Sequence, residues 1–132
     1  MYNRITAVVL FVQDFPKCLA FYRDQVGLEL VQEEPHFAAF KMFDQDFALL
    51  TLENGADMVG LDVESFEAQT GRGDRAMLCT RVDDVDKAYE TLRARGVVFT
   101  KAPVDQFWGI RAAYFRDPEG NIWEIAHPIA SN

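Results

Sequence analysis

The chain has 132 residues and 49% of them are hydrophobic, so it is long enough to bury the core of one ordinary domain. Its 13 basic and 21 acidic side chains leave a net charge of -8. This charge repels a phosphate backbone and excludes nucleic acid as an expected partner. It also favours cationic ligands, but acidity is an ordinary means of staying soluble, so charge alone names no ligand.

The two cysteines, Cys18 and Cys79, show neither a CxxC spacing nor a nearby histidine cluster, so no disulfide framework or zinc site is indicated. The apolar run from Ile5 to Val12 is far shorter than the roughly 20 residues of a membrane span. It also lacks a small-residue cleavage site. We therefore predict a buried strand here, no membrane association and a cytoplasmic location.

The first half of the chain reads as strand, helix and three strands. After the strand Ile5–Val12, Asp14 is a good helix N-cap and Pro16 suits the first turn. Apolar residues then recur at helical spacing as far as Gly27, which suits a left-handed helix end. The three strand-like runs that follow are Leu28–Glu33, Phe37–Phe43 and Phe47–Leu52.

Residues 54–75 are richer in Gly, Asp and Glu and are predicted to be a linker, with a short helical piece at Val63–Ala68. The first pattern then restarts. Asp84 is expected to cap a second helix that ends at Gly96. The strands expected around this helix are Ala76–Val82, Val97–Thr100, Arg111–Phe115 and Ile122–Ala126.

The two halves can be aligned by a constant offset. Val12, Asp14 and Lys17 meet Val82, Asp84 and Lys87 at a shift of 82 − 12 = 70 residues. Since the same cap, helix and strand order recur together with these identities, the sequence predicts an internal duplication.

Several motifs resemble those of the vicinal-oxygen-chelate superfamily (glyoxalase, bleomycin-resistance protein and extradiol dioxygenase), closest to its bleomycin-resistance-like branch. They are Val12-Gln13-Asp14 with Ala20-Phe21-Tyr22-Arg23, Gly27-Leu28-Glu29-Leu30, and the segment from Phe115 to Ile125 around Asp117-Pro118-Glu119-Gly120. The resemblance implies an α+β fold in which two tandem β-α-β-β-β modules form curved mixed sheets around a cavity. It implies a single domain over residues 1–132, with module 1 at about 4–53, the linker at 54–75, module 2 at about 76–128, and pairing into a homodimer.

The resemblance also implies where a metal would bind: a His, Gln or Glu on the first strand of each module and a carboxylate on the last. The first-strand positions here are Ala7 and Met77, and neither is a credible ligand. The last strand of module 1 offers Ala48, Leu49, Leu50 and Thr51, with Glu53 only at its end, whereas module 2 keeps Glu124. We therefore predict no cofactor. The alternative is a divalent Fe, Mn, Ni or Zn ion held by Glu124 with Glu53 or a histidine of another chain.

Glu124 is the best candidate for a catalytic group. It could bind a ligand amine, act as a general base, pair with Arg81 or Arg111, or be a satisfied polar residue between Trp123 and Ile125. In the register that the resemblance implies, alternation along the strands puts Ala7, Met77 and Glu124 on the same inner face. His36 and His127, the two histidines, are expected to have surface roles.

The segment Phe107-Trp108-Gly109 precedes Arg111 and could form a flat wall for a planar ligand beside one cationic donor. Core packing is the competing interpretation of the two aromatic residues. The predicted ligand-binding residues are Phe107, Trp108, Arg111, Glu124 and Met77.

Three functions are compatible with these features. The leading hypothesis is a metal-independent binding protein that sequesters a cationic or aromatic small molecule. The alternative is a metal-dependent lyase, dioxygenase or epimerase, and the third is a dimeric scaffold with a vestigial pocket. The identity of the ligand does not follow from the sequence, because this architecture carries many chemistries.

Overall fold

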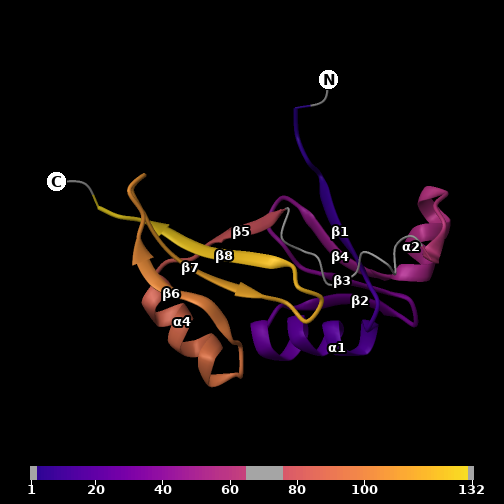
Figure 1. The fold of residues 1–132 in the computed structure, drawn as a ribbon, viewed down its shortest axis with the longest axis horizontal. Helices are drawn as coiled ribbons and strands as arrows, with labels where there is room; N and C mark the ends of the chain where they lie inside the picture. Colours follow the sequence, from indigo (N-terminus) through magenta and orange to yellow (C-terminus); the bar gives the residue numbers. More distant parts are fainter. Residues whose placement is uncertain (1–2, 65–75, 131–132) are drawn as a thin grey trace. The chain divides into compact units, whose positions relative to one another are not determined.

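The computed structural model describes residues 3–64 and 76–130. The chain divides into two compact units, Met1–Thr70 and Gly71–Asn132. Each unit contains one open four-stranded sheet with both parallel and antiparallel strands (Figure 1). The predicted α+β fold of two β-α-β-β-β halves is confirmed.

The first unit has the strand order β1-β4-β3-β2, in which β1 runs parallel to β4. Its elements are β1 (Ala7–Val12), α1 (Phe15–Ala20), the π-helix η1 (Phe21–Val26), β2 (Leu30–Glu34), β3 (Phe37–Phe40), β4 (Asp46–Thr51) and α2 (Leu52–Val59).

The second unit repeats this topology in the order β5-β8-β7-β6, with β5 parallel to β8. Its elements are β5 (Met77–Arg81), α4 (Val85–Ala94), β6 (Phe99–Asp105), β7 (Ile110–Arg116) and β8 (Ile122–Pro128).

The offset of 70 residues reflects the same helix start in both units. The Asp14 carboxylate accepts a hydrogen bond from the Lys17 backbone N–H at 3.1 Å, and Asp84 accepts one from Lys87 at 3.1 Å. Each aspartate thereby satisfies one of the N–H groups that a helix start leaves without an internal partner. Gly27 has φ of +88° at the end of η1, as the predicted left-handed helix end requires.

The structure differs from the sequence predictions between the two halves. Residues 54–75 were expected to form a linker, but the first of them continue α2, whose start Thr51 caps through its side chain. The Asn54 backbone N–H donates to Thr51 Oγ1 at 3.4 Å. Of the helical piece predicted at Val63–Ala68, Val63 and Glu64 are helical and the rest lies outside the described residues. The strand predicted at Phe37–Phe43 ends at Phe40.

Aromatic rings form the core between the first sheet and η1. Tyr22 is fully buried, and its ring centroid lies 5.1 Å from that of Phe21, 6.0 Å from Phe40 and 5.2 Å from Phe47. Phe40 and Phe47 are register partners on β3 and β4. One face of this sheet is therefore fixed against η1 by a Tyr-Phe cluster of the edge-to-face type.

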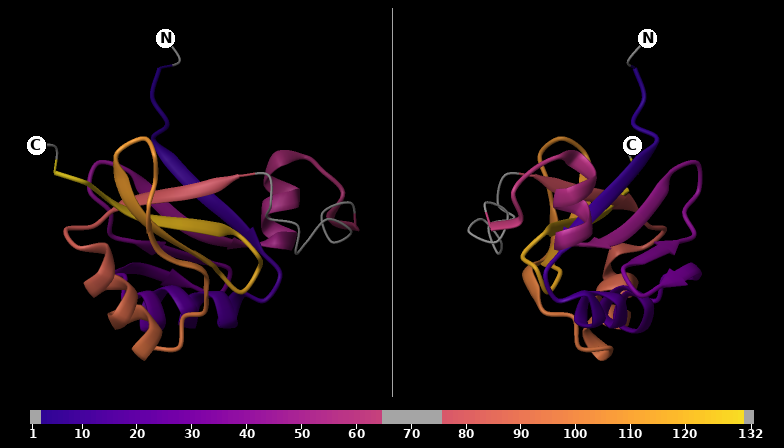
Figure 2. Two further views of the ribbon diagram at one scale, coloured as in Figure 1. Left: turned by 60° about the vertical axis from the view of Figure 1, so that its left-hand side comes forward. Right: turned by 90° about the vertical axis from the view of Figure 1, so that its right-hand side faces the viewer.

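The second unit uses the same construction. Tyr89 of α4 packs on Phe99 at a centroid distance of 4.6 Å, Phe99 lies 5.4 Å from Phe115, and Phe115 stacks parallel to Trp123 at 6.2 Å. The last three are register partners on β6, β7 and β8. This aromatic row fixes α4 to one face of the sheet. The ribbon in Figure 1 and Figure 2 shows α4 beside the strands of this sheet.

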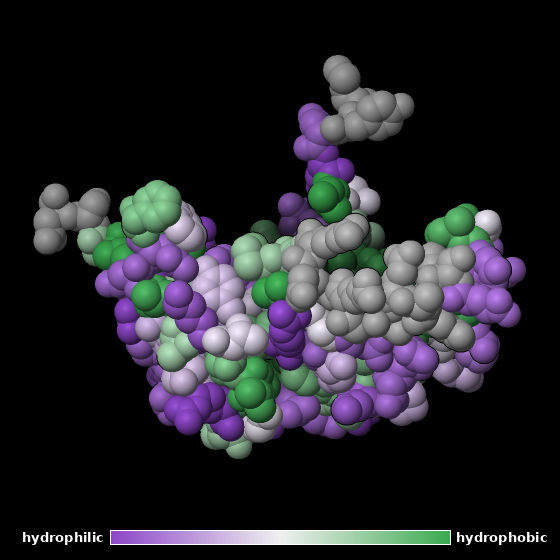
Figure 3. All heavy atoms as spheres, in the orientation of Figure 1, coloured by the Kyte–Doolittle hydropathy of each residue, from purple (hydrophilic) through white to green (hydrophobic). Residues whose placement is uncertain are grey.

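The surface mixes polar and apolar residues. Figure 3 shows polar side chains over most of one face of the molecule, with apolar side chains in separate patches. None of the helices in the described ranges is long and apolar enough to cross a membrane.

Gly55 of α2 provides a test of how α2 packs on β1. A Cβ atom at this position would lie 2.6–2.8 Å from ring atoms of Phe11, which is too close for an undisturbed contact. We predict that Gly55→Ala lowers the free energy of unfolding by about 1–3 kcal/mol, as overpacking does. Urea denaturation measures this. The neighbouring Asn54→Ala, on the exposed side of α2, is the matched control and should be near neutral. An increase in stability, as helix propensity alone would give, would contradict the packing.

Candidate functional site

The aromatic row decides which residues of the second sheet face away from α4. Since side chains alternate along a strand, the next row along β7, β8 and β5 must point to the opposite face. That row consists of Tyr114, Glu124 and Cys79, which are register partners. We call these three residues, together with Gln106, the Glu124 row.

Glu124 is a buried carboxylate within this row. It is 7% exposed, and its Oε2 atom accepts a hydrogen bond of 2.8 Å from the Tyr114 hydroxyl. The Tyr114 oxygen in turn accepts a hydrogen bond of 3.2 Å from the Gln106 side-chain amide. Because an unpaired buried carboxylate is costly, this donor chain is what lets Glu124 remain in the sheet. Of the partners considered from the sequence, neither Arg81 nor Arg111 takes this place.

The pKa values of Cys79 and Tyr114 are both raised in this row. Partial burial raises the pKa of the Cys79 thiol above its ordinary value, and the negative charge and acceptor oxygen of Glu124 raise it further. Burial and the hydrogen bond to Glu124 raise the pKa of Tyr114, against a smaller opposite effect of Gln106. The raised pKa values favour the neutral form of both groups, and Tyr114 is the one that donates to Glu124.

Met77 lies on the same face as Glu124, as alternation predicted. It precedes Cys79 by two residues on β5, pairs with Ile122, and its side chain is 46% exposed. Cys79 is also exposed. The β5 side of this face is therefore open to solvent.

Phe107 and Trp108 form the turn between β6 and β7 and are 96% and 54% exposed. Their rings meet edge to face at a centroid distance of 4.9 Å. The competing interpretation of core packing was therefore wrong. This turn begins directly after Gln106, so the hydrogen bond from Gln106 to Tyr114 ties the exposed aromatic pair to the Glu124 row.

The structure does not bring Arg111 to the Glu124 face. Arg111 is three residues before Tyr114 on β7 and points to the opposite side, where it clamps the Asp86 carboxylate of α4 with two hydrogen bonds of 2.8 Å. A third bond of 2.9 Å reaches Asp105. These contacts lower the pKa of Asp86 and raise that of Arg111. Arg111 joins α4, β6 and β7 and has no position in the wall predicted for a planar ligand.

The histidines also have structural positions. His127, the register partner of Arg111, accepts a 2.9 Å hydrogen bond at Nδ1 from the Val85 backbone N–H at the start of α4. It therefore satisfies one more N–H of this helix start. His36 lies in the turn between β2 and β3 and is exposed, as predicted.

The duplication identifies the counterparts of the Glu124 row in the first unit. Leu78, Trp123 and Phe115 align with Val8, Phe47 and Phe40, because each set forms one row on the helix-covered face. The next row is then Val9, Ala48 and Ala39 in place of Cys79, Glu124 and Tyr114. The counterpart of Glu124 is therefore Ala48, and the corresponding row of the first unit is apolar.

This equivalence tests whether the residues fit the metal that the resemblance implies. The four positions are Ala7, Ala48, Met77 and Glu124, and only Glu124 carries a hard oxygen donor. Protein metal sites of this type need three or four donors of N, O or thiolate character. In addition, no group of three or more His, Cys, Asp and Glu within residues 3–64 and 76–130 could hold a metal ion. The donor set does not fit a resident divalent metal.

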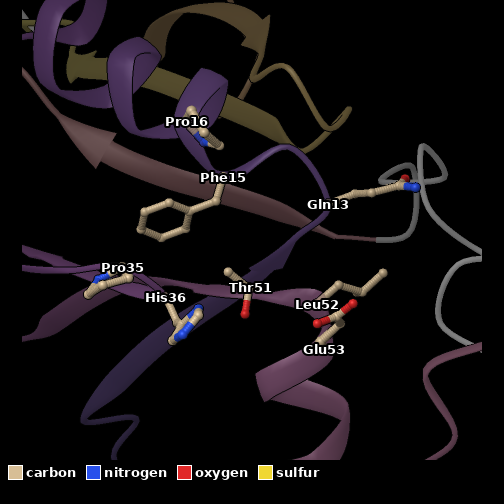
Figure 4. A pocket seen from close by; sticks show the side chains of 8 residues that line it. All are labelled: Gln13, Phe15, Pro16, Pro35, His36, Thr51, Leu52 and Glu53. Atoms are coloured by element: carbon tan, nitrogen blue, oxygen red, sulfur yellow. The ribbon is translucent and has the colours of Figure 1, made fainter.

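A separate cavity of about 360 Å³ lies within the first unit. Figure 4 shows that its lining comes from the end of β1, the start of α1, the turn between β2 and β3, and the junction of β4 with α2. Its lining residues are Gln13, Phe15, Pro16, Pro35, His36, Thr51, Leu52 and Glu53. It brings together Glu53 and His36, which the sequence analysis treated separately, but two such donors are too few to hold a metal.

Sequence reasoning missed Tyr114 and Gln106. The sequence contains one indication for Tyr114: it lies one residue before the core residue Phe115 on the same strand, so its side chain must point to the opposite face of the sheet. Gln106 gave no signal, because its contact depends on the path of the turn after β6.

The fold and the site together define a class of protein: an α+β chain of two units with one repeated topology, in which the second sheet carries a buried carboxylate on the face opposite α4. Residues 4–125 match the family described as Glyoxalase/Bleomycin resistance protein/Dioxygenase superfamily. The chain belongs to this superfamily.

Three known proteins illustrate the similarity. Protein YraH of Bacillus subtilis (strain 168) is 34% identical over 125 residues, which cover 92% of this chain and 96% of YraH. A crystal structure of a glyoxalase/bleomycin resistance protein/dioxygenase from Nocardioides superposes with a TM-score of 0.84 at 28% identity, covering 100% of this chain and 87% of that one. The structure of lactoylglutathione lyase from Agrobacterium tumefaciens has a TM-score of 0.68 at 23% identity, covering 96% and 94%. This last likeness concerns the fold alone.

The pH dependence of stability tests the position of Arg111. Because the pKa of Asp86 is lower in the folded chain than its unfolded value near 3.8, its ion pair contributes stability above that value. The contribution is lost as the pH falls through the depressed folded pKa. We predict that Asp86→Asn lowers the urea midpoint at pH 6 and that its difference from the parent vanishes toward pH 2. Asp83→Asn is the control. A constant difference across this range would contradict the ion pair.

Alkylation of Cys79 tests the Glu124 row. Thiolate is the reactive form, so the raised pKa of Cys79 predicts slow labelling by iodoacetamide between pH 7 and 9. Glu124→Gln removes the nearby negative charge and should shift the rate profile to lower pH. Cys18 is fully buried in the native chain, and Cys79→Ser should abolish labelling. An unchanged profile in Glu124→Gln would show that Glu124 does not act on the thiol.

Proposed function

We propose that the chain is a small-molecule-binding protein that holds a cationic or aromatic ligand on the Glu124 face of the second sheet without a resident metal ion. The observation that carries this proposal is Glu124 itself, a 7% exposed carboxylate that accepts a hydrogen bond of 2.8 Å from a neutral phenol, the Tyr114 side chain. A carboxylate offers about four lone-pair sites. Tyr114 uses part of this capacity, so Glu124 can still accept from a ligand.

The surroundings of Glu124 support binding in preference to metal-dependent chemistry. The three other positions at which the superfamily would hold a metal are Ala7, Ala48 and Met77. An alanine or a thioether there gives a ligand apolar contact area, not coordination. The exposed Phe107 and Trp108 add ring faces on which a planar or cationic group could stack.

Binding and metal content test this proposal together. We predict that untagged protein incubated with Fe(II), Mn(II), Ni(II) or Zn(II) and then dialysed retains well below one metal ion per chain by elemental mass spectrometry. A thermal-shift screen of cationic aromatic compounds should find ligands that stabilise the native chain. The gain should be about 2.7 kcal/mol at a free concentration of 100 times the Kd. Glu124→Gln should lose about 2 kcal/mol or more of binding free energy.

Two matched variants complete the design. Glu90→Gln removes the same charge from the exposed surface of α4, where its contact with Arg93 at 3.9 Å contributes little, and it should bind as the parent does. Glu53→Gln removes the carboxylate of the first-unit cavity. Near-stoichiometric metal that is lost in Glu124→Ala would establish the alternative of a metal-dependent lyase, dioxygenase or epimerase. A screen without any stabilising compound would favour a vestigial pocket, and binding lost only in Glu53→Gln would place the ligand elsewhere.

A further inference from the structure

The hydrogen bonds of the Glu124 row run in one direction. The Gln106 amide nitrogen donates to the Tyr114 oxygen at 3.2 Å, and the single Tyr114 proton is donated to Glu124 at 2.8 Å. An ionised carboxylate has no proton to give back. The row therefore directs its donors step by step toward Glu124. The groups left over at its ends are the remaining lone pairs of Glu124 and, on the Gln106 amide, its oxygen and its second N–H.

No basic side chain compensates Glu124 within the described part of the chain. None of the ion pairs there includes it. Lys101, the register partner of Tyr114 on β6, is not paired with the carboxylate in any of these ion pairs.

An acceptor-rich row with an uncompensated carboxylate selects its ligand by charge and by donor number. A carboxylate or phosphate group would meet the like charge of Glu124, which the single remaining N–H of Gln106 would not offset. A neutral hydroxyl could donate one proton, but it would not offset the buried charge. A primary ammonium brings a positive charge and three N–H donors, enough to bond Glu124 and a second acceptor such as the Gln106 oxygen.

We infer that the ligand of this protein is a primary amine bound as its ammonium ion by Glu124, with Tyr114 and Gln106 as the residues that orient the carboxylate for it. This inference rests on the proposed function and narrows it to one class of cation. Hydrogen bonding of an ammonium to Glu124 differs from stacking of a cation on Phe107 and Trp108 in a way that can be tested. A quaternary ammonium stacks on rings but has no proton to donate.

Four probes that share a phenyl ring and a methylene group separate these properties: benzylamine, benzyltrimethylammonium, benzyl alcohol and phenylacetate. Their binding is measured by NMR titration of the ¹⁵N-labelled chain, which detects weak binding and reports on the Gln106 side-chain amide and the Cys79 and Glu124 backbone. We expect benzylamine to bind about tenfold or more tightly than each of the others, the size of a hydrogen bond to a charged group. The shifted signals should include those of the Glu124 row.

Variants assign the preference to residues. Glu124→Gln should reduce benzylamine binding about tenfold or more while leaving benzyl alcohol nearly unchanged. Tyr114→Phe should lower the ratio of benzylamine to benzyltrimethylammonium affinity about threefold or more, since charge attraction survives but the carboxylate loses the donor that orients it. A general loss of stability would weaken the binding of both ligands alike, so it would leave the ratio of their affinities unchanged. Glu90→Gln should match the parent, and circular dichroism checks that each variant is folded.

The outcomes separate this inference from the proposed function. Equal binding of benzylamine and benzyltrimethylammonium would overturn the inference and assign recognition to the aromatic pair, leaving the binding function intact. The inference would also fail if none of the four probes bound while a thermal-shift hit still required Glu124. Benzylamine binding that is insensitive to Glu124→Gln but lost in Glu53→Gln would overturn both.

Discussion

The alternation of side chains across β7, β8 and β5 is the constraint on which the second unit depends. The stack of Phe99, Phe115 and Trp123 against Tyr89 fixes the register of these strands and the face that α4 covers. Because side chains alternate along a strand, the burial of that row against α4 places the next row on the opposite face of the sheet. Glu124 is therefore held opposite the helix by packing in which it takes no part, and the Tyr114 hydroxyl only has to satisfy it.

The duplication shows how two similar sheets can have different chemistry. In both units an aromatic row against the helix fixes the sheet, and the caps Asp14 and Asp84 start equivalent helices. On the opposite face the units diverge, because Ala48 stands where the second unit has Glu124. The divergence of one row leaves the fold unchanged, while the first unit has an alanine in place of the oxygen donor that the second unit carries. Fold membership and chemistry are therefore separable in this chain.

Much of the fold could be predicted from the sequence because it depends on local signals. The caps, Gly27 and the strand alternation that puts Met77 and Glu124 on one face are encoded within a few residues. Other features depend on the register of distant strands. Arg111 looked like part of a wall with Trp108 because the two are close in sequence, but an odd spacing of three from Tyr114 turns it toward Asp86. The partner of Glu124 could not be predicted without knowing that β7 pairs with β8 at Tyr114.

The central claim is that Glu124 binds a ligand directly and without a metal. A crystal structure of the chain grown with a bound arylalkylamine tests it most directly. The account predicts the ammonium nitrogen about 2.7–2.9 Å from a Glu124 carboxylate oxygen, with the Tyr114 hydroxyl still donating to the other side of the same group. An amine located away from Glu124, or a metal ion coordinated by Glu124 between ligand and protein, would contradict it.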